Sequence, residues 1–127
     1  MDIQWLKEAT NDREQISAYR QKLHACAETG FDLPKTTAVV SAALSDLGLV
    51  PQKTGRSGIT ATIGNGSPAV ILRADMDALP IREKTGLGFA SKNGNMHTCG
   101  HDIHTAMLLG AAGLLCRHRH ALKGCIK

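Results

Sequence analysis

Aromatic side chains are scarce in this sequence of 127 residues, at 3% of the total. A core without them has to be built from aliphatic and small side chains. Apolar residues, at 43%, are numerous enough for a globular fold. Because small residues let helices lie close to a sheet, the composition favours layers of helices and strands in one domain of moderate size.

The sequence also lacks a strong excess of one charge. Its net charge is +4 and its pI is near 9.0. The basic residues are scattered and are not interleaved with aromatic ones, so a nucleic acid is not an expected partner. The one local basic cluster, residues 117–120, follows an apolar helical segment, where cations suit the negative end of the helix dipole.

No segment has the pattern of an export or membrane signal. The first eight residues are amphipathic and carry an early acidic residue, unlike a secretory leader. No apolar run approaches the roughly 20 residues of a membrane span. We therefore expect a cytoplasmic protein without a membrane partner. Its four cysteines are then reduced, and without a Cys-x-x-Cys pair a redox thiol protein has little support.

Apolar residues at helical spacing predict four helices. They are expected over residues 2–9, 13–28, 36–47 and 103–118. Asn11 or Asp12 is expected to cap the second helix, and Thr36 or Thr37 the third. His24 lies on the second helix, where we expect a structural role.

Strands are predicted over residues 49–54, 59–63, 69–72 and 123–127. The run 69–72 is continuously apolar, as expected for a strand that is covered on both faces. Residues 64–68 predict a hairpin-like turn before it. Together with the helices, these strands predict an α/β fold.

Two carboxylates follow the 69–72 strand directly. Loops after the carboxyl ends of strands are where α/β sheets place their sites. Asp75 and Asp77 point to the same side if the backbone is extended. One could bind or orient a metal ligand, and the other could pair with Arg73. The simpler alternative, favoured by this segment alone, is that both are turn residues before Pro80.

Three histidines, a cysteine and an aspartate crowd into eight positions around the start of the last predicted helix. Thiolate and imidazole are preferred ligands of zinc and similar ions. We predict Cys99 and His101 as metal ligands, with Gly100 allowing the tight backbone between them. His104, one turn further on, is a further ligand or a substrate contact, and His97 could orient a ligand.

The alternative for this cluster is structural, with Asp102 or Thr105 as a helix cap and the histidines solvated. The density of metal-binding side chains makes it the weaker interpretation. Two ligands do not complete a zinc site, which has four ligands or three and a water. Asp75 or Asp77 could supply a third, whereas Cys116 lies roughly 20 Å away along the helix and is excluded.

Residues 72–83, 89–91 and 96–106 resemble the metal-dependent amidohydrolase family, and residues 19–24 resemble its opening helices. The family includes hippurate hydrolases, N-acyl-amino-acid amidohydrolases and auxin-conjugate hydrolases, within the aminoacylase and carboxypeptidase superfamily. The resemblance implies a zinc-peptidase-like α/β domain with a mixed sheet flanked by helices. It also implies one or two divalent ions, of Zn, Mn, Co or Ni.

By motif position, Cys99 and His101 are similar to the family's metal ligands. Asp75 matches its catalytic carboxylate, which orients a ligand or the catalytic machinery. Arg73 stands where more distant relatives carry a ligand histidine, and we do not assign it to metal. The implied reaction is hydrolysis of the amide bond of N-acyl amino acids such as hippurate, or of a short peptide-like substrate. The metal activates the carbonyl and water, and a glutamate is the general base.

The family's paired glutamates, a later histidine ligand and an inserted dimerisation domain have no counterpart in residues 1–127. We therefore expect the N-terminal portion of a truncated catalytic domain, without the C-terminal half, inactive by itself and weak in metal affinity. The resemblance implies homo-oligomers, and an exposed sheet edge and helix face should make this chain self-associate. The alternative function is a small non-catalytic metal-binding or regulatory module, which would bind metal tightly by itself.

Overall fold

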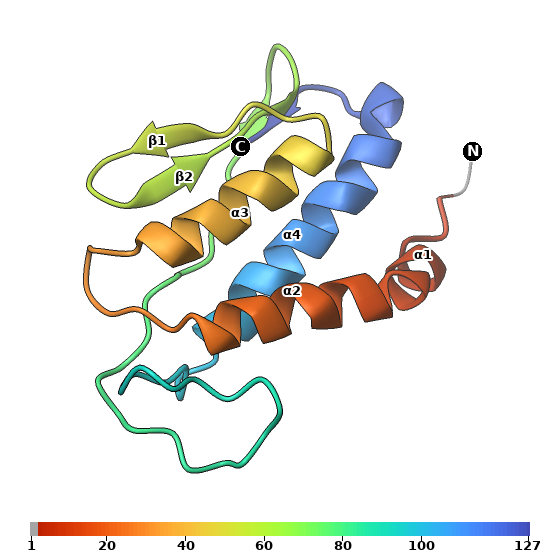
Figure 1. The fold of residues 1–127 in the computed structure, drawn as a ribbon. Helices are drawn as coiled ribbons and strands as arrows, with labels where there is room; N and C mark the ends of the chain where they lie inside the picture. The colour runs from red at the N-terminus through yellow and green to blue at the C-terminus, as the bar shows by residue number, and fades with distance from the viewer. Residues whose placement is uncertain (1–2) are drawn as a thin grey trace.

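The computed structural model describes residues 3–127, in which four α-helices pack with short strands (Figure 1). The helices are α1 (Trp5–Asn11), α2 (Arg13–Ala25), α3 (Pro34–Asp46) and α4 (His101–Arg117), followed by the 3-10 turn η1 (Arg119–Ala121). The strands are β1 (Gln52–Thr54), β2 (Gly58–Thr60), β3 (Ile63–Gly64), β4 (Ala69–Val70) and β5 (Cys125–Ile126). All four predicted helices are present with shifted ends. Position 2 of the first predicted helix lies outside the described residues.

The strands form two small sheets. β1 and β2 make an antiparallel hairpin, with Gln52 opposite Thr60. In the second sheet β5 lies between β3 and β4, antiparallel to the first and parallel to the second. This sheet is therefore mixed, as predicted. The chain between β3 and β4 does not join neighbouring strands, so the hairpin predicted at residues 64–68 is wrong.

Residues 69–72 are not covered on both faces, contrary to the sequence prediction. The exposed fraction is 51% for Val70 and 74% for Ile71. Their backbone is paired nonetheless, because Leu72 donates to the carbonyl of Lys127 and Lys127 donates to that of Val70. On α4, Met107 is also exposed. Exposed apolar side chains are thus present on the β4 segment and on α4, whereas the self-association expected from them stays a prediction.

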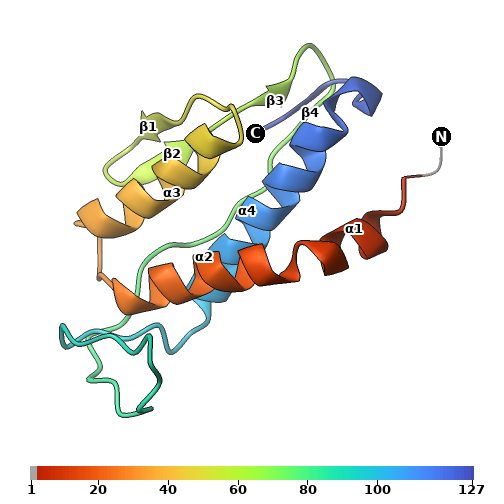
Figure 2. The ribbon, with the colours of Figure 1, turned by 45° about the vertical axis from the view of Figure 1, so that its right-hand side comes forward.

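The helices enclose an aliphatic core. Figures 1 and 2 show α2 crossing α4, and α3 between α4 and the β1–β2 hairpin. Buried members of the core are Leu23, Val40, Leu44, Ile63, Ala106 and Leu109, with Ala43 and Ala112. At the α2–α4 crossing, a Cβ on Gly110 would lie 2.7 Å from Ile16 side-chain atoms. Glycine at this position therefore permits the close approach of the two helices.

The start of α3 depends on a residue outside the helix. The helix begins at Pro34, two residues before the predicted start, and proline is tolerated there because the first N–H groups need no helical partner. The Glu28 carboxylate accepts hydrogen bonds from the backbone N–H groups of Lys35 (3.0 Å) and Thr36 (2.8 Å). Glu28, rather than Thr36 or Thr37, therefore caps α3.

The basic cluster at the end of α4 holds α1 in place. His118 Nε2 lies 2.8 Å from a Glu8 carboxylate oxygen, and Arg117 pairs with Asp12 at 2.5 Å. The hydrogen bond from His118 contributes most to lowering the pKa of Glu8 below its usual range. Asp12 makes no capping bond at the start of α2, because this ion pair engages its side chain. Within residues 3–127, no helix has the length and apolar character needed to cross a membrane.

Two glycines of α4 should respond differently to alanine. At Gly113 a new Cβ would lie 3.6 Å from Leu47, an ordinary contact, so Gly113→Ala should stabilise the chain by about 0.5–1 kcal/mol through helix propensity. At Gly110 the same gain is opposed by overlap with Ile16, so Gly110→Ala should be the less stable variant. Urea unfolding measures both. The difference should shrink in an Ile16→Ala background, and an unchanged difference would contradict this packing.

Removing the α3 cap should destabilise the fold. Glu28→Ala leaves two backbone N–H groups of the helix without their acceptor, which costs about 1 kcal/mol for a typical cap. Thermal unfolding followed by circular dichroism measures this cost. Asp32→Ala is the matched control, because Asp32 is an exposed carboxylate in the same loop. Equal destabilisation by the two substitutions would show that Glu28 is not a cap.

Candidate functional site

The predicted ligands Cys99 and His101 flank a sharp turn at the start of α4. Gly100 has a φ of 87°, in the left-handed region that favours glycine, and α4 begins at the next residue. The Cys99 thiol is free and exposed. The turn therefore presents an accessible thiol beside the first side chain of the helix.

The ring of His101 is oriented by the segment after β4. Its Nδ1 lies 2.8 Å from the backbone carbonyl oxygen of Asp77 and 3.1 Å from an Asp77 carboxylate oxygen. Because a carbonyl oxygen only accepts, Nδ1 carries the proton and donates it. In a neutral ring, Nε2 then holds the free lone pair. That atom lies 3.8 Å from Asp75 Oδ2, beyond hydrogen-bond length.

Asp77 is hydrogen-bonded to His101 and Asp75 faces the opposite ring nitrogen, so neither acts only as a turn residue. Asp75 is also paired with Arg73 at 2.6 Å, and its backbone carbonyl accepts a hydrogen bond from the Thr105 hydroxyl at 2.8 Å. The second of these contacts attaches the segment to α4. An imidazole nitrogen, a thiol and a carboxylate at one end of the helix are the donor types that divalent ions such as zinc prefer, so these residues fit such an ion in the chemistry of their side chains.

The other two histidines of the cluster differ in their surroundings. His104 is exposed, with its ring 5.9 Å from the ring of His101. His97 is buried, and neither of its ring nitrogens has a hydrogen-bond partner among residues 3–127. Burial lowers the pKa of His97 and favours its neutral form. In that described range, no group of three or more His, Cys, Asp or Glu side chains is placed to hold a metal ion.

A buried ionic cluster next to this turn was not predicted from the sequence. Asp102 is 1% exposed and does not serve as a simple helix cap. Its Oδ2 accepts from Arg20 Nε at 2.9 Å and contacts His24 Nδ1 at 2.8 Å. The other ring nitrogen of His24 lies 2.8 Å from Glu83 Oε1. The structural role expected for His24 is thus a bridge between two carboxylates.

Both carboxylates of this cluster remain ionised at neutral pH. Burial tends to raise the pKa of Asp102, but hydrogen bonds from His24 and Arg20 outweigh it and hold the pKa below its usual range. Burial also tends to raise the pKa of Glu83, but hydrogen bonds from Thr85 and His24 outweigh it and hold that pKa below its usual range. The spacing of Arg20 and His24, four residues apart on one helical face, was the available sequence signal. Glu83 lies in the segment 72–83 that resembles the amidohydrolase family, but no spacing in the sequence pairs it with His24.

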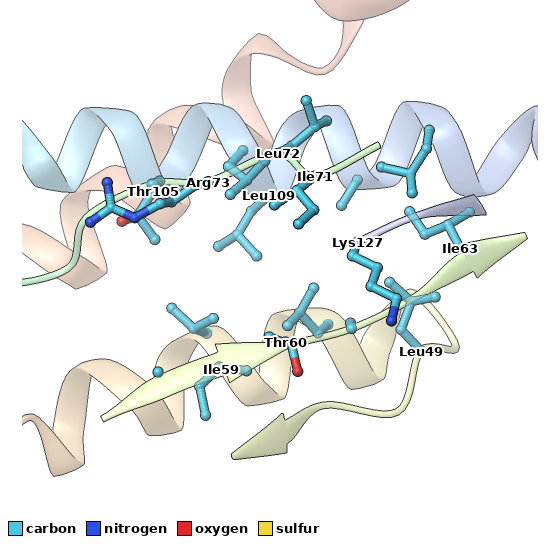
Figure 3. Close-up of a pocket in the computed structure, with 18 of the residues that line it drawn as sticks. Leu49, Ile59, Thr60, Ile63, Ile71, Leu72, Arg73, Thr105, Leu109 and Lys127 are labelled. Atoms are coloured by element: carbon cyan, nitrogen blue, oxygen red, sulfur yellow. The ribbon is translucent and has the colours of Figure 1, made fainter. Parts of the chain in front are cut away.

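An apolar cavity of about 440 Å³ lies beside the site. Figure 3 shows Ile71 and Leu72 on one side of it, Ile59 and Thr60 on the other, and Lys127 between them. Arg73 and Thr105 line one end of the cavity, whereas Cys99, His101 and Asp75 are not among its lining residues. The cavity therefore adjoins the candidate ligands through Arg73 and Thr105 but does not contain them.

Comparison with known proteins relates the chain to hydrolases. Residues 71–127 match the model of peptidase family M20/M25/M40. The N-acetyl-L-cysteine deacetylase of Bacillus subtilis (strain 168) is 45% identical to the chain, over 99% of the chain and 33% of that protein. The N-acyl-L-amino acid amidohydrolase of Geobacillus stearothermophilus is 41% identical, over 91% of the chain and 32% of that protein. The chain thus spans about a third of the length of these relatives.

A solved structure agrees with the sequence comparisons. The Bacillus subtilis YXEP protein, described as a dinuclear metal binding peptidase from the M20 family, superimposes with a TM-score of 0.85 at 37% identity. The match covers 92% of this chain and 34% of that protein. It includes the α/β arrangement described above. The chain therefore belongs to the M20/M25/M40 family of peptidases.

Proposed function

We propose that this chain is part of a metal-dependent amidohydrolase that cleaves N-acyl amino acids. In this proposal Cys99 and His101 bind one or two divalent ions, of Zn, Mn, Co or Ni. The observation that carries it is the hydrogen bond from His101 Nδ1 to the carbonyl of Asp77. Histidines that bind metals typically donate their second ring N–H to a carbonyl or carboxylate, which fixes the tautomer and aims the other nitrogen at the ion.

The names of the relatives support the substrate class. One is a deacetylase of N-acetyl-L-cysteine and another an amidohydrolase of N-acyl-L-amino acids. Both names describe hydrolysis of an amide between an acyl group and an amino acid. A small N-acyl amino acid, or a short peptide-like molecule, is therefore the proposed substrate. The dinuclear metal binding described for the YXEP protein supports the use of divalent metal.

Each proposed site residue has a distinct task. A bound metal would polarise the amide carbonyl and lower the pKa of a water molecule. Cys99 contributes a thiolate and His101 its Nε2 lone pair. Asp75, held by Arg73 at 2.6 Å, faces that nitrogen and supports the site as its catalytic carboxylate. His104, which is exposed one turn along α4, is the proposed further ligand or substrate contact.

The remaining parts of the enzyme are proposed to lie outside this chain, which spans about a third of its relatives. We propose that residues 1–127 form the N-terminal portion of the catalytic domain. No residue here matches the family's glutamate base, so the chain alone should not turn over substrate and should bind metal weakly. A cytoplasmic location and homo-oligomers complete the proposal.

A chimera tests the enzymatic function. Residues 1–127 replace the corresponding third of the Bacillus subtilis N-acetyl-L-cysteine deacetylase, to which they are 45% identical. The chimera should hydrolyse N-acyl amino acids when supplied with Zn, Mn, Co or Ni. Cys99→Ala or His101→Ala should each lower kcat/KM by about 100-fold or more through loss of a ligand.

His120→Ala is the control for the chimera, because His120 is exposed near the far end of α4 and should leave activity unchanged. His104→Ala separates its two proposed roles: a substrate contact mainly raises KM, whereas a ligand also lowers metal content. A folded, metal-supplied chimera without activity would count against the proposal. Full activity of Cys99→Ala would remove Cys99 from the site.

Metal titration of the 127-residue chain distinguishes the enzyme from the alternative of a small metal-binding module. Cobalt bound by Cys99 should give a thiolate-to-cobalt absorption band that saturates only at high cobalt concentration, because two ligands leave the coordination of the ion incomplete. Cys99→Ser should abolish the band, and Cys116→Ser should not. Tight, stoichiometric binding by this chain would instead favour the module.

A further inference from the structure

The cluster of Arg20, His24, Glu83 and Asp102, here called the buried ionic cluster, holds three separate elements together. Arg20 and His24 come from α2, and both contact Asp102 Oδ2 in the first turn of α4. Glu83 comes from the long loop between β4 and α4 and reaches His24 from the other side. One histidine side chain therefore connects α2, the loop and the start of α4.

Glu83 is hydrogen-bonded to residues of its own loop as well as to His24. Its side chain is 0% exposed, and its oxygens also accept from the Thr85 hydroxyl (2.7 Å) and the Ser91 backbone N–H (2.5 Å). Phe89, from the same loop, packs edge-on against His24 and lies beneath the Arg20 guanidinium, 5.0 Å from it. The loop is thus fixed to α2 by charge, hydrogen bonds and an aromatic ring.

The candidate ligand turn lies between the two anchored elements. The loop carrying Glu83 leads into Cys99, whereas Asp102 follows His101 directly in α4. The loop is anchored through Glu83 upstream of the turn, and α4 is anchored through Asp102 directly after it, with His24 linking the two anchors. His97, which is buried two residues before Cys99, has its ring centroid 6.3 Å from that of His24. The cluster therefore packs against the approach to the turn as well as its exit.

We propose that the buried ionic cluster is a positioning site, which sets the separation of the Cys99 thiol and the His101 ring and thereby the affinity for a divalent ion. The inference rests on the metal ligands named under the proposed function. None of the four cluster residues is itself assigned as a ligand. Residues that orient metal ligands typically change metal affinity by 10–100-fold when substituted.

A matched control exists on the same helix. Glu8, Arg117 and His118 form a second ionic cluster, which fastens α1 to the opposite end of α4, away from Cys99. If the buried ionic cluster only stabilises the fold, substitutions in the two clusters should affect metal binding alike. If the buried ionic cluster positions the ligands, only substitutions in that cluster should weaken metal binding. The variants are compared under conditions in which all of them are folded.

Cobalt titration of the 127-residue chain, read by the thiolate-to-cobalt absorption band, is the experiment. His24→Gln and Glu83→Gln should each weaken cobalt binding by about 10-fold or more and shift the band, because the geometry around the thiolate changes. Glu8→Gln and His118→Gln should change affinity less than two-fold. Circular dichroism identifies a temperature at which each variant is folded. If His24→Gln does not fold, Glu83→Gln alone decides the test.

Amide hydrogen exchange provides a readout that does not depend on metal. In the Glu83→Gln variant, protection should fall at residues 104–107, whose N–H groups are the first of α4 with a helical acceptor, and stay unchanged in α3. Wild-type cobalt affinity and an unshifted band in both cluster variants would overturn the proposal. If the wild-type chain gives no thiolate band, the proposed metal ligands fail and hydrogen exchange decides the positioning role. Unchanged protection at residues 104–107 would then overturn that role as well.

Discussion

Asp102 is a carboxylate with 1% of its surface exposed, and a buried charge without partners costs several kcal/mol. Arg20 and His24 compensate it at 2.9 and 2.8 Å, and both come from one face of α2. The requirement to pair this charge therefore fixes where α2 crosses α4. It also fixes the first turn of α4, from which His101 projects, and through Glu83 it fixes the loop that leads to Cys99.

The helices could be predicted from the sequence because their apolar residues recur at a helical period and face one core. The strands could be predicted only in part. The run at 69–72 is apolar enough for a buried strand. An apolar pattern does not reveal whether other residues of the chain pack against it, and in the described residues Ile71 remains 74% exposed. The hairpin expected at residues 64–68 failed because β5, far along the chain, inserts between β3 and β4. Glu28 was missed as a cap because it contacts α3 from outside the helix.

The candidate ligands were chosen from the sequence, and their binding of metal stays a prediction. The order Cys-Gly-His gave two ligand types across a glycine, and the spacing of Asp75 and Asp77 allowed both to share one side. The structure divides their tasks: Asp77 orients His101 mainly through its backbone carbonyl, whereas Asp75 faces the opposite nitrogen. Every residue has a backbone carbonyl, so the sequence could not predict that the Asp77 carbonyl orients His101. The meeting of His24 with Glu83 depends on a loop conformation that no periodicity encodes.

The pairing of α2 with α4 also determines the order in which the chain can fold during its synthesis. Asp102 is 82 residues from Arg20 and 78 from His24 in sequence, so α2 leaves the ribosome long before its ionic partner exists. Contacts of such long range form slowly, since a large loop must close first. β5, which joins β3 to β4, follows α4 in the sequence. The nascent helices α2 and α3 therefore cannot pack against α4, and the sheet cannot form around β5, until the last quarter of these residues has been synthesised. Until then, the apolar faces of α2 and α3 that pack on α4 stay exposed.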